Sequence, residues 1–277
     1  MAQSVRMEMI FLIEKSFSES NNVSCCKNPT SKGIFAQIIL RTMKKGLQKA
    51  WGYIWKGVLF FFVSTIFVTL VYRFIPVPLT PLMLIRLVEQ VADGDPIRLS
   101  KDWVSYEEIT PHLPLAVVAS EDQQFLGHYG FDINAIEKAM KNNNRKRKKS
   151  IKGGSTISQQ TAKNVFLWPQ RSWIRKGFEV YFTLLIETLW SKERILEVYL
   201  NVIEMGNGIY GAEAASQAYF HKPASRMNAS EAALIAAVLP NPLKWNAGKP
   251  TAYINKRKNW ILRNMRNLET LEFEEKE

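Results

Sequence analysis

Cysteine is scarce in this 277-residue chain, which contains only Cys25 and Cys26. The two are adjacent and precede a long apolar run, so we expect them to stay reduced and predict neither a structural disulfide nor a metal site. Glycines with nucleotide-binding spacing are also lacking. No Gly-Lys-Ser/Thr follows Gly153 and Gly154, and we expect Gly206–Gly211 to form a loop. A disulfide scaffold and a P-loop enzyme are therefore excluded.

Negative charge is in short supply, with 25 Asp and Glu against 37 Lys and Arg, which gives a net charge of +12. An excess of positive charge suits contact with anionic lipid and with phosphate-bearing substrates. Its densest part, Lys141–Lys152, would suit nucleic acid in a cytosolic protein. Here we interpret it as a mobile loop near a membrane, or as a merely solvated loop, and predict no nucleic-acid partner.

One apolar run is long enough to cross a bilayer. Gly57–Tyr72 carries no charge, and with the aromatic segment that starts at Trp51 it approaches the roughly 20 residues that a spanning helix needs. Trp51, Trp55 and Tyr72 stand where interfacial aromatic side chains are found. We predict a transmembrane helix over residues 51–75. The alternative is a buried core helix.

The distribution of cations predicts the orientation of this span. Only Arg73 follows it closely, whereas five cations precede it, namely Arg41, Lys44, Lys45, Lys49 and Lys56. By the positive-inside rule, residues 1–50 form a cytoplasmic tail and the rest lies across the membrane. No small-x-small cleavage site follows the run, so we expect no cleaved signal peptide. Residues 1–42 carry no recognisable chemistry, and we hypothesise that the native start is Met43.

Residues 76–110 form a membrane-proximal segment. Leu79–Ala92 follows three prolines and has apolar residues at helical spacing, and the sequence Asp-Gly-Asp-Pro then ends it. Two interpretations remain open at this point, a membrane-proximal amphipathic helix and the first helix of the core.

A first candidate carboxylate lies in a predicted helix over Leu115–Gly130. Glu121, Phe125 and His128 would share one face of this helix, next to apolar residues that would partly desolvate the carboxylate. Such a group suits a general base. An acid stabilised by the helix dipole and a structural histidine are the simpler alternatives.

A second candidate region follows the turn Gly153-Gly154. The glycines permit close backbone approach, Ser155 is predicted to cap the next helix, and free N–H groups at its start would attract an anion. Thr156, Gln160 and Lys163 share a face of that helix, as would suit a phosphate ester or sugar hydroxyls. Turns of this kind also occur in proteins that bind nothing.

A third predicted helix, Ser172–Trp190, brings Arg175 and Lys176 beside Glu179. An ordinary ion pair within a helix is the alternative. We favour Glu187 as a buried structural acid over a polar anchor of the site.

Five strings in a fixed order resemble the motifs of the peptidoglycan glycosyltransferases. They are EDQQFLGHYG from Glu121, GGSTISQQ from Gly153, RKGFE from Arg175, KERILEVYLN from Lys192, and EAALI from Glu231 with PNP ending at Pro242. The chain most closely resembles the monofunctional biosynthetic transglycosylases of Gram-negative bacteria, because no penicillin-binding transpeptidase domain follows.

This resemblance implies a mostly α protein, in which a single N-terminal transmembrane helix is followed by a lysozyme-like helical glycosyltransferase domain. We assign that domain to residues 111–265 and a C-terminal tail to 266–277. The implied substrates are lipid II, a disaccharide-pentapeptide on undecaprenyl pyrophosphate, and the growing lipid-linked glycan. The implied setting is the bacterial inner membrane with a periplasmic domain, among its lipids and other cell-wall synthesis or division proteins.

The resemblance also implies roles for single residues. Glu121 corresponds to the general base, and Glu179 to a second acid that supports the donor pyrophosphate directly or through Mg²⁺ or Mn²⁺. We predict no metal site formed by protein ligands alone, so such an ion would be held by Glu179 together with the donor pyrophosphate. The residues expected around the donor are Thr156, Gln160, Lys163, Arg175 and Lys176. Supporting positions are Asp122, Phe125, His128, Ser155 and Asn201. Ser158 stands where threonine is usual, and we expect little consequence because a hydroxyl is kept.

Two rival functions remain open. A lysozyme-like hydrolase or lytic transglycosylase would share the fold and the glutamate but would not need Lys163, Arg175 and Lys176. A non-enzymatic membrane scaffold would need neither carboxylate.

Overall fold

The computed structural model describes residues 31–94, 96–134, 137, 154–170, 172–268, 271 and 273, with the backbone alone for 31–39. It divides into two units, Met1–Val63 and Ser64–Glu277, which we describe separately. The predictions made for Cys25, Cys26, the loop Lys141–Lys152 and Gly153 lie outside the described residues.

The first unit contains the beginning of helix α2 (Ser31–Phe74). The part of α2 from Leu40 to Phe74 is long and apolar enough to cross a membrane. Its large apolar side chains are exposed, as for Phe60 at 74%. A helix this apolar that buries so little is what a bilayer, rather than a protein core, would cover. This part of α2 thus fits a single-pass membrane anchor, and it includes nearly all of the predicted span 51–75.

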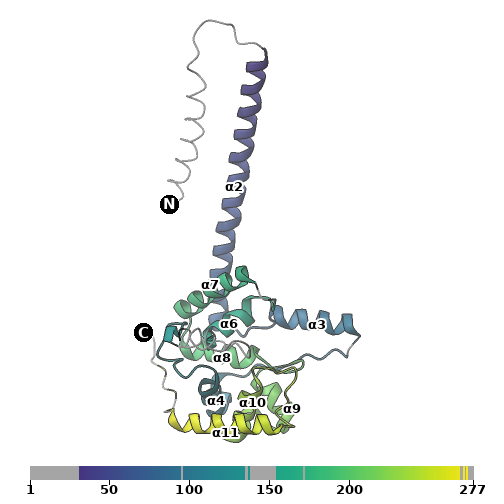
Figure 1. Ribbon diagram of the computed structural model, residues 1–277, viewed down its shortest axis with the longest axis vertical. Coiled ribbons are helices and arrows are strands. Elements are labelled where there is room, and N and C mark those ends of the chain that lie inside the picture. The colour runs from purple at the N-terminus through teal and green to yellow at the C-terminus, as the bar shows by residue number, and fades with distance from the viewer. Residues whose placement is uncertain are drawn as a thin grey trace. The chain divides into compact units, whose positions relative to one another are not determined.

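The second unit begins with the last part of α2 and consists mainly of helices, as predicted (Figure 1). In chain order these are α3 (Pro81–Asp93), the 3-10 helix η1 (Tyr106–Glu108), α4 (His112–Glu121), α6 (Ile157–Phe166), α7 (Trp173–Leu189), α8 (Lys192–Val202), α9 (Ala212–Phe220), η2 (Ala224–Arg226), α10 (Ala229–Val238) and α11 (Ala252–Asn267).

Two helix groups build the core. Helix α10 packs against α4 and α11, and α6 packs against α7 and α8. Alanines on α10, among them Ala233 and Ala237, are fully buried, so the neighbouring backbones approach closely. The end of α4 and the beginning of α6 are joined by a hydrogen bond from Ile157 N–H to Asp122. This junction sets the geometry of the site described below.

The last turns of α2 are fastened to the second unit by hydrogen bonds to backbone carbonyls. Trp190 Nε1 donates to the carbonyl of Thr69 at 2.8 Å. Arg194 donates to the carbonyls of Tyr72 and Ile75 at 2.8 and 2.7 Å. The carbonyl of Tyr72 is one of the orphan carbonyls of the helix end, and a guanidinium there also complements the negative end of the helix dipole.

A small three-stranded sheet was not predicted. Its strands are β1 (Ser100–Lys101), β2 (Glu204–Gly206) and β3 (Ile209–Tyr210), in the order β1-β3-β2. The expectation of a loop over Gly206–Gly211 was therefore wrong, because this segment forms a hairpin of β2 and β3. Gly208 has φ +71, and a Cβ there would lie 2.4 Å from the carbonyl oxygen of Arg98. The glycine spacing thus reflects a tight turn with close backbone approach.

The predicted helix over Leu115–Gly130 was wrong at both ends. Helix α4 begins at His112 and ends at Glu121, and Asp122 leaves helical geometry with φ −158 and ψ 77. The carboxylate of Asp122 instead bonds His128 and the N–H of Ile157. Glu121, Phe125 and His128 therefore do not share a helix face, because the chain leaves the helix after Glu121. Gly130 has φ +77 but lies beyond the end of α4, so the predicted helix stop at this residue was wrong.

Candidate active site

Glu121, the last residue of α4, is held through both carboxylate oxygens. Its Oε2 accepts a hydrogen bond from Gln160 Nε2 at 3.2 Å. Its Oε1 accepts from Ser120 Oγ at 3.2 Å and lies 3.5 Å from Arg257 Nη2. The carboxylate is half-buried. It is thus fixed in orientation while remaining accessible, as a general base requires.

Tyr199 orients the amide of Gln160. The Tyr199 hydroxyl donates to Gln160 Oε1 at 3.2 Å, which leaves the amide N–H₂ for Glu121. Tyr199 is fully buried, and this burial, with the negative charges of Glu121 and Asp122, raises the pKa of its hydroxyl well above the ordinary value. Tyr199 therefore stays neutral and keeps its proton for Gln160. The predicted contact of Gln160 with substrate stays a prediction.

Asp122 and His128 form a buried link between α4 and α6. His128 Nε2 lies 2.9 Å from Asp122 Oδ1, and Asp122 Oδ2 accepts the N–H of Ile157 at 2.9 Å. A carboxylate at a helix N-terminus is stabilised by the helix dipole. Asp122 thereby occupies the helix start where we had expected a bound anion, because the first N–H of α6 is already satisfied.

The residue that caps α6 is Thr156, so the predicted cap at Ser155 was wrong. Thr156 Oγ1 accepts the N–H of Gln159 and donates to the carbonyl of Gly130 at 2.7 Å. The side chain of Gln159 bonds back to the N–H of Thr156, which completes a capping box. Ser155 is exposed, whereas Thr156 is buried. The predicted roles of Thr156 and Ser155 toward substrate stay predictions.

Glu179 lies between two cations on the first turns of α7. Arg175 Nη1 is 3.1 Å from Glu179 Oε2, and Lys176 Nζ is 2.5 Å from Glu179 Oε1. The predicted clustering of the three side chains is confirmed. Glu179 is buried, so the two cations stabilise a carboxylate that would be costly to bury alone. The same cations can turn to an external phosphate, the group that guanidinium and ammonium bind best.

Lys163 links this cluster to Glu121. Its pKa is lowered from 10.5, first by burial and then by the positive charges of Arg175 and Lys176, while the negative charges of Glu179 and Glu121 act in the opposite sense. The charges of both carboxylates act on this one ammonium group. Helix α6, which carries Lys163 and the Glu121 partner Gln160, packs against α7, which carries Glu179. These observations favour one site for the two sets of predicted residues.

A buried ion pair lies next to His128. Lys192 Nζ is 2.8 Å from Glu187 Oε1, which also accepts a hydrogen bond from Ser158 Oγ. Lys192 donates to the carbonyl of His128 at 2.7 Å and lies 4.7 Å from the ring centre of buried Phe125. Glu187 is thus a buried structural acid, as favoured from the sequence. Ser158 contributes its hydroxyl to this network.

Asn201 has a structural position. Its buried amide pairs with both backbone groups of Val104, accepting at 3.0 Å and donating at 2.9 Å. It ties α8 to the segment before η1. The predicted supporting role of Asn201 in the site stays a prediction.

Sequence analysis missed Arg257, Ser120 and the hydroxyl of Tyr199. Arg257 is one of five cations in α11, where no acid distinguishes it from its neighbours. Tyr199 follows the apolar spacing of α8, a pattern that indicates a core residue, and it is fully buried. No local signal marks either residue, because each meets its partner only through tertiary packing.

Comparison with protein families agrees with this geometry. The family model described as Transglycosylase matches residues 89–266. This range contains Glu121, Lys163, Glu179 and Arg257. The chain belongs to the transglycosylase family.

Curated relatives cover most of the chain and are all named biosynthetic peptidoglycan transglycosylase. A relative from Bacteroides thetaiotaomicron is 60% identical over 207 residues, which is 75% of this chain and 83% of the relative. One from Bdellovibrio bacteriovorus is 56% identical over 220 residues, 79% and 87% of the two chains. One from Yersinia pseudotuberculosis is 49% identical over 228 residues, 82% and 94%.

Proposed function

We propose that this protein polymerises lipid II into glycan strands, transferring the lipid-linked glycan to the 4-hydroxyl of the N-acetylglucosamine of an incoming lipid II. The observation that carries the proposal is that α6, which bears Lys163 and the Glu121 partner Gln160, packs against α7, which bears Glu179, Arg175 and Lys176. One end of the site can accept a proton, and the other can receive a departing pyrophosphate. Family membership supports the same function.

In the proposed reaction Glu121 takes the proton of the acceptor hydroxyl. The freed oxygen attacks the anomeric carbon of the donor, and the bond from that carbon to the pyrophosphate breaks as the new glycosidic bond forms. A single in-line displacement inverts the anomeric centre, so no covalent sugar intermediate is needed. A base placed in this way contributes about 10² to 10⁴ in rate.

The leaving group gains negative charge, and fixed cations lower the barrier when their contacts strengthen as that charge develops. We assign this role to Lys163, Arg175 and Lys176. Thr156 and Gln160 would lie nearby, with Thr156 acting mainly through the cap it provides for α6.

A divalent cation, Mg²⁺ or Mn²⁺, stays a prediction. In the described part of the chain no group of three or more His, Cys, Asp or Glu could hold a metal ion. Glu179 is already paired with two cations, so its carboxylate does not form a metal site with its neighbours. No step proposed here depends on the ion.

The proposal includes location. The bacterial relatives and the apolar part of α2 support an inner-membrane protein with a cytoplasmic N-terminus and a periplasmic catalytic unit. A single cysteine at exposed Lys249, in a variant without Cys25 and Cys26, should react with a membrane-impermeant thiol reagent in cells whose outer membrane is permeabilised. Labelling only after lysis of the inner membrane would indicate the opposite orientation. Contacts with other cell-wall synthesis or division proteins also stay a prediction.

Polymerisation by purified protein tests the function. Detergent-solubilised protein and labelled lipid II should yield polymer, whereas a hydrolase would digest existing glycan and a scaffold would do neither. Glu121→Gln should bind lipid II but form no polymer, and Glu107→Gln, at an exposed glutamate of η1, serves as the matched control. Polymer formed at the wild-type rate by folded Glu121→Gln would refute the assignment.

A further inference from the structure

Helix α3 is attached to the second unit through its polar face. Arg86 Nε lies 3.7 Å from Glu204 Oε2, a carboxylate buried in the small sheet. The side chain of Gln90 pairs with the backbone of Arg98, accepting its N–H at 2.6 Å and donating to its carbonyl at 3.2 Å. These polar contacts, together with the buried Met83, thus attach the helix to the unit.

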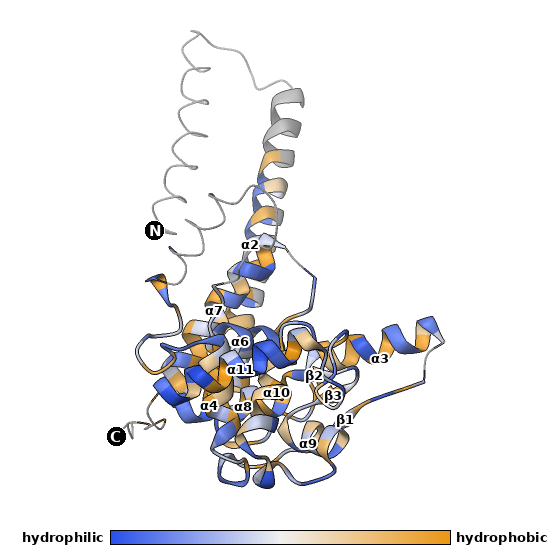
Figure 2. Cartoon of the chain, turned by 60° about the horizontal axis from the view of Figure 1, so that its bottom comes forward, coloured by the Kyte–Doolittle hydropathy of each residue, from blue (hydrophilic) through white to orange (hydrophobic). Residues whose placement is uncertain are grey.

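The apolar face of the same helix points outward. Leu84, Val88 and Val91, spaced so that they lie on one face, are 50%, 69% and 63% exposed. The only buried residue of α3 is Met83. A surface helix of a soluble protein has the opposite arrangement, with its apolar stripe toward the core. Figure 2 shows α3 extending from the body of the unit with both apolar and polar residues along it.

Exposed apolar residues continue on both sides of α3 in the sequence. They are Phe74, Ile75 and Leu79 before the helix and Ile97 and Leu99 after it. An apolar surface of this kind that is not covered by the protein's own core marks a site of contact with a membrane or another protein.

The position of α3 favours the membrane. Six residues, 75–80, separate the end of α2 from Pro81. A fully extended chain spans at most about 3.6 Å per residue, so the start of α3 lies within about 25 Å of the end of the span. In Figure 1, α3 runs crosswise to the last turns of α2, on the side of the unit where those turns lie and away from α11.

We propose that α3 lies in the interface of the membrane that α2 spans, with Leu84, Val88 and Val91 inserted among the lipids. The helix has one positive residue, Arg86, and two negative residues, Glu89 and Asp93, so its net charge gives no attraction to anionic lipid. Its contact comes from apolar burial, as in interfacial amphipathic helices whose polar face remains outside the lipid. With α2 it forms a second fixed point, which limits the tilt of the catalytic unit relative to the bilayer.

Fluorescence of the full chain in vesicles tests this proposal. In a Cys25→Ser, Cys26→Ser background, Val88→Cys is labelled with an environment-sensitive fluorophore, and Asp93→Cys on the polar face is the matched control. Both are reconstituted in phosphatidylcholine vesicles, which have no net charge, with and without nitroxide-labelled lipid. We expect a blue-shifted emission at position 88 that nitroxide lipid quenches several-fold more than at position 93.

Equal, water-like emission at the two positions would overturn the proposal. A blue shift at position 88 that depends on the ratio of protein to lipid and is insensitive to nitroxide lipid would also overturn it, and would indicate a second copy of the chain as the occupant. Matching thermal unfolding of the two labelled variants establishes that both are folded. The measurement requires no lipid II, so its outcome is independent of the proposed transferase activity.

Discussion

Arg257 Nη2 lies 3.5 Å from Glu121 Oε1, although the two residues are 136 positions apart. Ser120 joins them, since its hydroxyl accepts from Arg257 at 3.1 Å and donates to Glu121 at 3.2 Å. The C-terminal helix α11 is thereby fastened to the proposed base at the end of α4. With Tyr199 and Gln160 on the other side, the carboxylate is held from two directions.

Arg257 should act as a positioning residue for Glu121. We expect Arg257→Met to lower kcat about tenfold to hundredfold with little change in KM for lipid II, because a misplaced catalytic group loses rate of this order. Arg257→Lys should recover most of the loss, since it restores a nearby positive charge. Steady-state polymerisation kinetics, with thermal unfolding of each variant, provide the measurement.

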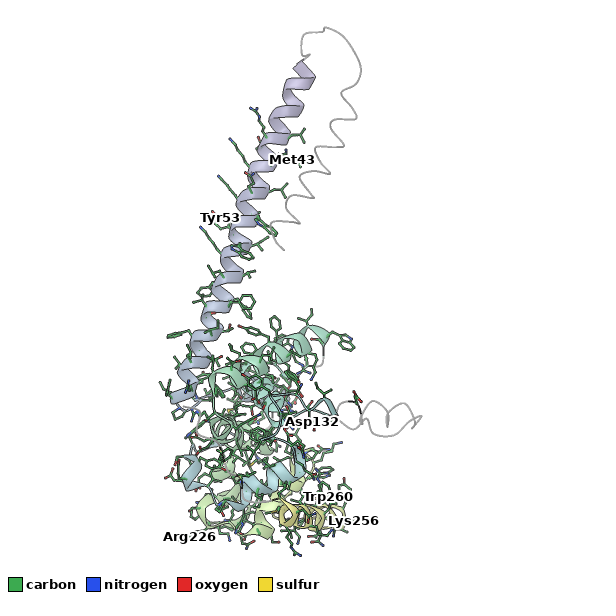
Figure 3. The ribbon with its side chains drawn as sticks, turned by 90° about the vertical axis from the view of Figure 1, so that its left-hand side faces the viewer. Met43, Tyr53, Asp132, Arg226, Lys256 and Trp260 are labelled. Carbon is green, nitrogen blue, oxygen red and sulfur yellow. The ribbon has the colours of Figure 1, made fainter. Side chains whose placement is uncertain are left out.

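Two cations of α11 supply controls for this prediction. Lys256 and Arg263 are exposed, and Figure 3 shows Lys256 and Trp260 at the end of the unit formed by α11. Lys256→Met and Arg263→Met should leave kcat unchanged. An increase in KM at constant kcat for Arg257→Met would instead indicate direct contact with substrate.

Lys163 should determine the alkaline limit of activity. Its lowered pKa means that it loses its charge at a lower pH than an exposed lysine, and the grip on the donor pyrophosphate weakens as it does so. Arginine stays charged throughout, so Lys163→Arg should extend kcat/KM to higher pH. Lys163→Ala should lower kcat/KM about tenfold to hundredfold at neutral pH, as for loss of a charged hydrogen bond. Lys256→Arg is the control. An alkaline limb that is identical in wild type and Lys163→Arg would refute this role.

The sequence predicted the elements of the site better than the bonds between them. Ser172 caps α7 as expected, and Glu179 meets Arg175 and Lys176 because residues three and four apart on a helix are neighbours. Helical periodicity failed just after Glu121, where the bonds of Asp122 to a distant part of the chain override local preference.

The same limit explains the misplaced cap and the unpredicted hairpin. Thr156 and Ser155 have similar capping preference, and the choice falls on Thr156 because its hydroxyl also reaches the carbonyl of Gly130. The short strands β2 and β3 carry too few residues for an alternating pattern. Their glycines could be recognised as a turn, but the pairing with β1 comes from more than a hundred residues earlier in the chain.

The buried pair of Lys192 and Glu187 should contribute strongly to folding. Lys192→Met removes one partner and leaves a buried carboxylate, which costs about 3–5 kcal/mol. For a unit of this size that corresponds to a fall of roughly 6–20 °C in Tm. The double variant Glu187→Gln/Lys192→Met should recover part of this loss, because no uncompensated charge remains. Differential scanning calorimetry in detergent measures both. Equal destabilisation of the single and double variants would show that packing of Lys192 on Phe125, rather than charge, is the main contribution.

Glu204 should make the second unit less stable as pH rises from acid to neutral. Burial raises the pKa of its carboxyl above 4.5, and the nearby Arg86 only partly opposes this. A raised folded-state pKa means that the folded protein binds the proton more tightly than the unfolded chain. The stabilisation is then fully present below the pKa of the unfolded chain and is lost as pH rises through the pKa of the folded protein.

Glu204→Gln has no such proton to lose, so its Tm relative to wild type should increase between pH 4 and pH 7. Exposed Glu107→Gln controls for the substitution itself. A difference in Tm that is constant over this range, or that falls, would mean that the ion pair with Arg86 outweighs burial.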